Sequence, residues 1–172
     1  MDDLDVVWEK MLEDGIARAR AGGRDSAAEY LTLKAGNDQI RRTSVRWLLD
    51  SMIELASGHA GSVPAIKIEK EEPHNFSIYG ANMVGSLLRF RQGVRCLTLE
   101  AGWTRTPKDG FMRGGALAFA RLIHFGMPKA NEELALVRSA DTPHWLVNNG
   151  GAVGAEFGTS GLLRHFHTFT DD

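Results

Sequence analysis

The stretch that decides the fold is MVGSLLRFRQGVRCLTLEAGW, residues 83–103. Its first half alternates in a period of two, and four residues would share one face of a strand: Val84, Ser86, Leu88 and Phe90. Gln92-Gly93 offers a tight turn, and the returning strand carries Val94, Cys96, Leu97 and Leu99. The stretch predicts a β-hairpin with a second apolar face, so we expect cover on both sides of the sheet.

Two further strands are predicted before this hairpin. Apolar and polar residues alternate over residues 66–69 and again over 76–79. Pro64 and Pro73 flank the first of these runs, and its solvent face is charged. Both features are typical of a strand near the edge of a sheet.

The first sixty residues predict a helical layer. Apolar residues recur at helical spacing over 4–19, and Gly22-Gly23 supplies a stop. Ser26-x-x-Glu29 has the spacing of a capping box and predicts the start of a second helix. Gly36-Asn37 either ends that helix or lies inside a longer one that reaches Gly58.

The chain after the hairpin gives weaker signals. Residues 104–115 predict a loop, because Pro107-Lys108-Asp109-Gly110 is a strong turn sequence. Residues 116–125 are rich in Ala and Leu and precede Gly126-Met127-Pro128, which favours a helix, although their alternation would also suit a strand.

Two short strands are predicted near the C-terminus, over residues 134–137 and 145–147. The glycine-rich segment 148–161 fits no nucleotide-binding loop and is expected to be a flexible connection or a segment ordered by a partner subunit. Residues 162–169 suit either a strand or a helical turn. Together these patterns predict one α+β domain over residues 1–172, with N-terminal amphipathic helices packed on a mainly antiparallel β-sheet (1–60 helical, 61–172 mainly β).

The composition is that of an ordinary globular protein, with 43% apolar and 24% charged residues. The longest apolar runs fall short of the roughly 20 residues of a membrane span, and the N-terminus is acidic where a signal peptide would be basic. The single cysteine, Cys96, excludes an internal disulfide and is expected to be a small buried side chain. We therefore expect a cytoplasmic protein.

The net charge of −2 makes nucleic-acid and membrane partners unlikely, yet residues 81–127 carry seven basic and two acidic side chains. Three of the basic residues, Arg105, Lys108 and Arg113, cluster on the glycine-flanked loop after Trp103. Such a loop could close on a carboxylate or phosphate. The alternative is a solvated face with scattered ion pairs.

Glu100 is the candidate catalytic residue. It lies near a strand end beside Trp103, where loss of water would raise the carboxyl pKa and suit acid or base chemistry. The alternative is a structural ion pair with Arg89, Arg95 or Arg121.

His165 and His167 are the candidate metal ligands. On a strand both imidazoles would project from one face, and His124, Asp141 or His144 might complete a three-ligand site. No zinc-binding or EF-hand motif accompanies them.

The leading hypothesis for function is a non-catalytic binding or scaffold domain whose basic loop holds an anionic small molecule or protein segment, and a homo-oligomer is the expected assembly. The second is a small metal-assisted hydrolase that uses the His-x-His pair with Glu100 as base. A purely structural subunit is the third. The sequence names no cofactor.

Overall fold

The computed structural model describes residues 3–140, 142–149 and 152–170. They form two compact units, Met1–Arg42 and Thr43–Asp172. The boundary falls inside a helix, and the single-domain organisation expected from the sequence stays a prediction.

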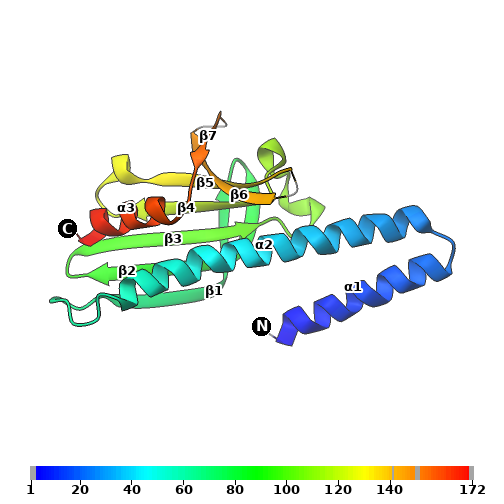
Figure 1. Ribbon diagram of the computed structural model, residues 1–172, viewed down its shortest axis with the longest axis horizontal. Helices are drawn as coiled ribbons and strands as arrows, with labels where there is room; N and C mark the ends of the chain where they lie inside the picture. Colours follow the sequence, from blue (N-terminus) through cyan, green and yellow to red (C-terminus); the bar gives the residue numbers. More distant parts are fainter. Residues whose placement is uncertain (1–2, 141, 150–151, 171–172) are drawn as a thin grey trace. The chain divides into compact units, whose positions relative to one another are not determined.

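The first unit is a helical hairpin made by α1 (Asp3–Ala21) and the first half of α2 (Asp25–Ser57) (Figure 1). The Arg42 guanidinium donates to the Glu9 carboxylate at 3.0 Å, and the Lys34 ammonium lies 5.6 Å from the centre of the Trp8 ring. The predicted stop at Gly22-Gly23 is confirmed. The second helix continues through Gly36, because one glycine costs only about 1 kcal/mol in a helix whose later turns are well buried.

The second unit is built on an antiparallel sheet, and within the described residues its seven strands follow the order of the chain. The strands are β1 (Lys67–Ile78), β2 (Ala81–Gln92), β3 (Arg95–Trp103), β4 (Ala118–His124), β5 (Glu132–Ser139), β6 (Thr142–Asn149) and β7 (Ala152–Glu156). The helix α3 (Thr159–Thr170) follows β7. The predicted α+β class, with two N-terminal helices and an antiparallel sheet, is confirmed.

The predicted hairpin is β2 and β3. Leu88 pairs with Leu99 and Gln92 with Arg95. Gly93 has a φ of +59°, a left-handed conformation that glycine adopts readily, and it forms the turn with Val94, one residue later than the predicted Gln92-Gly93.

Two of the sequence-based element assignments were wrong. The two predicted runs form one strand, Lys67–Ile78, with a register shift between Glu71 and His74, where Pro73 lacks the N–H of a regular ladder. Residues 118–124 form strand β4, not a helix. That strand lies in the interior of the sheet with both faces largely covered, so alanine and leucine replace the clear alternation of an exposed strand.

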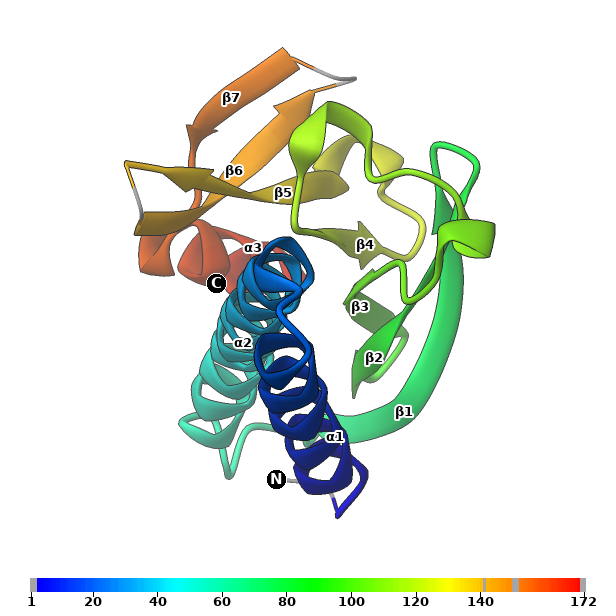
Figure 2. The same cartoon turned by 90° about the vertical axis from the view of Figure 1, so that its right-hand side faces the viewer.

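One face of the sheet packs on helices, and we call it the helix face. Figure 2 shows the strands curving around the second half of α2, with α3 beside it. Trp145 Nε1 donates to the Ser44 carbonyl at 3.1 Å, and the rings of His59 and Phe166 lie 4.7 Å apart. The largest fully buried side chains of this face are Leu88, Phe90, Leu97, Leu99, Leu122 and Leu134.

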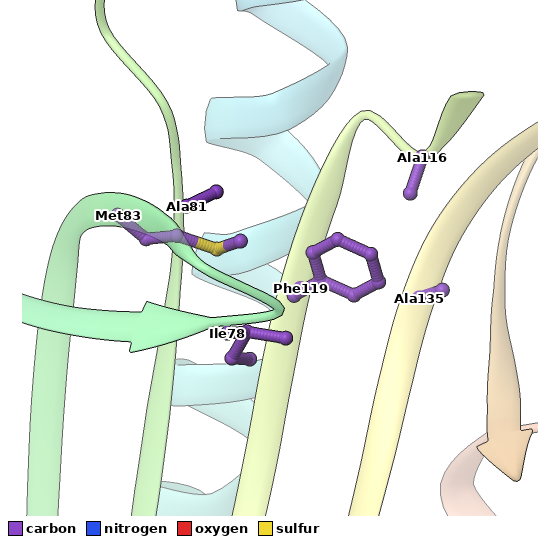
Figure 3. Close-up of a cluster of buried hydrophobic side chains, with 6 residues drawn as sticks. All are labelled: Ile78, Ala81, Met83, Ala116, Phe119 and Ala135. Carbon is purple, nitrogen blue, oxygen red and sulfur yellow. The ribbon is translucent and has the colours of Figure 1, made fainter. Parts of the chain in front are cut away.

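The opposite face, called the outer face, has a smaller apolar cluster near the β1–β2 turn. Figure 3 shows Phe119 at its centre, between side chains from β1, β2 and β5: Ile78, Ala81, Met83 and Ala135. Met112 and Ala116 from the loop between β3 and β4 cover it. Elsewhere the outer face carries polar and charged side chains, among them Arg89, Thr98 and Glu100, beside apolar ones such as Leu87.

Gly85 and Gly102 pair across β2 and β3 at a point of unusually close approach. A Cβ atom at Gly85 would lie 1.8 Å from the Ala101 carbonyl oxygen, and one at Gly102 would lie 2.6 Å from the Val84 carbonyl oxygen. Only glycine fits at these two positions.

Within the described part of the chain, none of the helices combines the length and the apolar character that a membrane span requires.

Candidate functional site

The basic loop after β3 does not gather its three cations at one point. The Arg105 guanidinium lies 3.8 Å from the centre of the Trp103 ring and donates to the Val84 carbonyl at 3.0 Å. The Arg113 guanidinium lies 4.8 Å from the Tyr79 ring. Trp103 follows the helix-face alternation of β3, so the two guanidinium groups are held by different parts of the sheet.

The loop itself is held by Asp109. Its Oδ2 atom accepts hydrogen bonds from the backbone N–H groups of Thr106 at 2.9 Å and Arg105 at 3.1 Å, and from the Thr106 hydroxyl. These bonds, the Thr106 backbone first, lower the pKa of the Asp109 carboxyl. Lys108, the neighbouring residue, is exposed.

Glu100 lies on the outer face, buried between His74 and Arg121. His74 Nε2 donates to its Oε2 at 2.8 Å, and Arg121 donates to its Oε1 through Nε at 2.8 Å and also through Nη2. Of the side-chain surface, 8% remains exposed at Glu100 and 18% at His74. Arg121 was one of the three ion-pair partners considered from the sequence, whereas His74 was not foreseen.

The bond between His74 and Glu100 joins β1 to β3 across β2. His74 is the register partner of Gly85 on β2, and Glu100 belongs to the strand beyond it. This arrangement fits the structural alternative for Glu100, because its carboxylate is occupied by two partners.

A second polar group lies beside it on the outer face. The Glu133 carboxylate accepts hydrogen bonds from the Tyr79 hydroxyl at 2.6 Å and from the Asn148 amide. The bond to Glu133, followed by burial, raises the pKa of Tyr79. Glu133 pairs in register with Arg121, so the two groups adjoin.

The predicted metal pair is not brought together. Residues 165 and 167 lie in α3, where positions two apart point to different sides; His165 is buried and His167 is exposed. Asp141 lies outside the described residues. Among those described, no group of three or more His, Cys, Asp or Glu side chains could hold a metal ion.

His165 instead forms a buried pair with His124. Nε2 of His124 and Nδ1 of His165 are 2.8 Å apart, and His165 Nε2 donates to Glu132 Oε1 at 3.4 Å. Burial, and then the neighbouring His165, lower the pKa of His124 to about 4; burial also lowers the pKa of His165. Both rings are thus neutral at pH 7, and His124 Nδ1 has no hydrogen-bond partner among the described residues.

A basic hollow opens on the outer face near the β2–β3 turn. It measures about 450 Å³ and is lined by Arg89, Arg91, Gly93, Val94, Arg95, Cys96, Thr98, Ile123 and Phe125. Glu69 pairs with two of these arginines, at 3.1 Å from Arg89 and 3.8 Å from Arg91. Within the described ranges, three arginines and no acidic side chain line this hollow.

A smaller hollow of about 210 Å³ adjoins it, between the ends of β3 and β4 and helix α3. Four residues line both hollows: Val94, Arg95, Cys96 and Phe125. The others that line the smaller one are His124, Met127, Thr168 and Phe169. Cys96 is only partly buried, so the expectation of a buried thiol was wrong: its strand position lies at the rim of these hollows.

The hollows were not predicted from the sequence, although their arginines belong to the positive stretch noted there. The available signal was the strand period: Arg89 and Arg91 on β2 share a face with Cys96 and Thr98 on β3. None of the three loop cations lines either hollow in the described structure.

Comparison of the chain with protein-family models, curated proteins and solved structures gave no match.

Proposed function

We propose that the protein is a non-catalytic binding domain whose basic hollow holds the carboxylate or phosphate group of a small molecule. The observation that carries this proposal is the convergence of Arg89, Arg91 and Arg95 on one hollow. Arg89 and Arg91 share the Glu69 carboxylate, and the Arg95 guanidinium donates to the Phe169 carbonyl at 3.4 Å, while the described residues that line the hollow include no acidic side chain that would repel an anion.

The chemistry of arginine supports an oxyanion as the ligand. The planar guanidinium presents paired N–H donors that match carboxylate and phosphate oxygens. The volume of about 450 Å³ is within the range of ordinary small-molecule sites. The sequence-based hypothesis put the anion on the loop of Arg105, Lys108 and Arg113; the hollow is the better candidate because it is concave and gathers its cations.

The test compares two sets of variants in calorimetric titrations with inorganic phosphate at low ionic strength. Arg89→Ala/Arg91→Ala should weaken binding about tenfold or more, since a hydrogen bond to a charged group contributes about 1.5–3 kcal/mol. Lys108→Ala, which removes one exposed charge from the loop, is the matched control and should bind as the parent does.

Two results would contradict this proposal. One is a parent protein that does not bind phosphate or acetate at millimolar concentration. The other is a loss of phosphate affinity in Lys108→Ala that equals the loss in the double variant. That result would indicate that the anion binds at the loop after β3.

Two finer expectations remain proposals on sequence grounds, namely that the protein acts in the cytoplasm and that it forms homo-oligomers. Light scattering coupled to gel filtration measures the oligomeric state directly. The hydrolase hypothesis predicts bound zinc, manganese or iron in the purified protein, which elemental analysis would detect.

A further inference from the structure

The smaller hollow indicates what kind of anion the basic hollow takes. We infer that the ligand is an amphiphile whose anionic head group binds the arginines while its short alkyl chain enters the adjoining hollow beside α3. This inference rests on the proposed function, because it concerns the apolar part of the same ligand whose anionic group binds the basic hollow.

The first observation is that the two hollows share part of their lining. Four residues line both, so a molecule held in one lies next to the opening of the other. Their volumes of about 450 and 210 Å³ suit a head group and a chain, respectively. The smaller volume equals about seven water molecules at ~30 Å³ each, enough for a short alkyl chain.

The second observation is the apolar character of the smaller hollow. Val94, Phe125, Met127 and Phe169 line it. Val94 is 94% exposed and Phe125 is 76% exposed, although both are large apolar side chains next to a charged hollow. Exposed apolar groups gathered beside a site commonly mark a binding surface.

The polar groups that line the smaller hollow are neutral or already hydrogen-bonded. The Arg95 guanidinium, which lines both hollows, donates to the Phe169 carbonyl at 3.4 Å. His124 is buried and its ring is neutral at pH 7, because its pKa is lowered to about 4 by burial and by His165. The Thr168 hydroxyl donates to the Arg164 carbonyl at 3.0 Å within α3, so its hydrogen-bonding need is met there.

Charge complementarity selects the anionic amphiphile over a neutral one. The only strongly charged side chains that line the pair of hollows, within the described residues, are the three arginines. A neutral apolar molecule would leave them without a new partner. An alkyl phosphate or carboxylate satisfies both regions at once.

The test measures the affinity of the full-length protein for inorganic phosphate, butyl phosphate and octyl phosphate, each below the concentration at which it forms micelles. Each methylene removed from water should tighten binding about threefold to fourfold. Octyl phosphate should therefore bind at least tenfold more tightly than inorganic phosphate, with butyl phosphate between them.

Thr168→Phe is the informative variant, because Thr168 lines the smaller hollow but not the basic hollow. A phenyl ring there should fill the hollow, abolish the advantage of octyl phosphate and leave the affinity for inorganic phosphate unchanged. His167→Phe is the matched control, since it adds the same ring to an exposed position of α3 that lines neither hollow.

The outcomes separate the two proposals. Equal affinities for inorganic and octyl phosphate would overturn the amphiphile and leave the anion site standing, whereas no binding of any of the three removes both. The last measurement uses vesicles that contain anionic phospholipid. If the parent protein and the Thr168→Phe variant bind these vesicles equally well, the apolar residues contact a lipid surface instead of enclosing an alkyl chain. That result would also overturn the inference.

Discussion

The two faces of the sheet differ in what their side chains do. On the helix face, Leu88, Leu97 and Leu99 are fully buried under α2 and α3. On the outer face, the neighbouring positions of the same strands hold Arg89, Thr98 and Glu100. The strand period of two thus separates the apolar side chains of the main core from the polar side chains of the outer face.

The largest expected effect comes from the helix face. Leu99→Ala should lower the free energy of unfolding by about 2–5 kcal/mol, because it leaves a cavity in a fully buried cluster. Its neighbour Thr98 points to the outer face, and Thr98→Ala should cost less than about 1 kcal/mol. Urea denaturation measures both; similar losses for the two variants would contradict the division between the faces.

The next effect depends on pH and on the buried histidine pair. The pKa of His124 is about 4 in the folded protein and near 6.5 when unfolded, so the unfolded state binds more protons between these values. Stability should fall as the pH drops from about 6.5 to 4, by an amount on the order of 3 kcal/mol.

The histidine contribution can be isolated with His124→Gln, which keeps a hydrogen-bonding side chain and does not titrate. Denaturation at pH 7 and at pH 4.5 should show a smaller difference for this variant than for the parent. Glu132 and Arg164, which adjoin His165, remain in both proteins. An identical difference in the two proteins would show that His124 does not carry the effect.

A smaller loss is expected from the ion pairs of the outer face. Glu100→Gln removes the charge that binds Arg121 and His74, and should cost about 1–3 kcal/mol, since Arg121 keeps a third of its side chain exposed. Glu100→Gln/Arg121→Met should recover part of that loss, because it removes the unpaired cation as well. Thermal denaturation of the two variants provides the comparison.

The smallest effect on stability should come from the basic hollow. Arg89 and Arg91 form exposed ion pairs with Glu69, and such pairs contribute about 0–1 kcal/mol. Arg89→Ala/Arg91→Ala should therefore melt close to the parent while losing phosphate. A large drop in melting temperature would mean that these arginines hold the sheet together instead.

The sequence predicted those elements whose local pattern agrees with their surroundings. The hairpin of β2 and β3 was found because alternation and Gly93 both indicate it. Strand β4 was mistaken for a helix because its Ala and Leu residues and the following Gly126-Met127-Pro128 also suit a helix, and burial on both faces leaves the alternation weak. Tertiary packing, not local preference, decided that segment.

The candidate site was predicted only in part for a related reason. Arg121 was among the partners considered for Glu100, although its segment was expected to be helical, whereas His74 comes from β1, beyond a register shift and two strands away from Glu100. The smaller hollow forms where α3 packs beside the ends of β3 and β4. The sequence pattern of a single segment does not predict such a contact between distant segments. Long-range contacts of this kind need coordinates.

The bond between His74 and Glu100 has a consequence for how the sheet comes apart. Because His74 passes over β2 to bond Glu100, the outermost strand is tied to the third strand as well as to the second. Strand exchange between chains begins when the edge strand β1 separates from β2. Here that separation would also break the side-chain bond between His74 and Glu100, which backbone pairing alone does not include. The amides along β1 should accordingly exchange with solvent more slowly than those of an untethered edge.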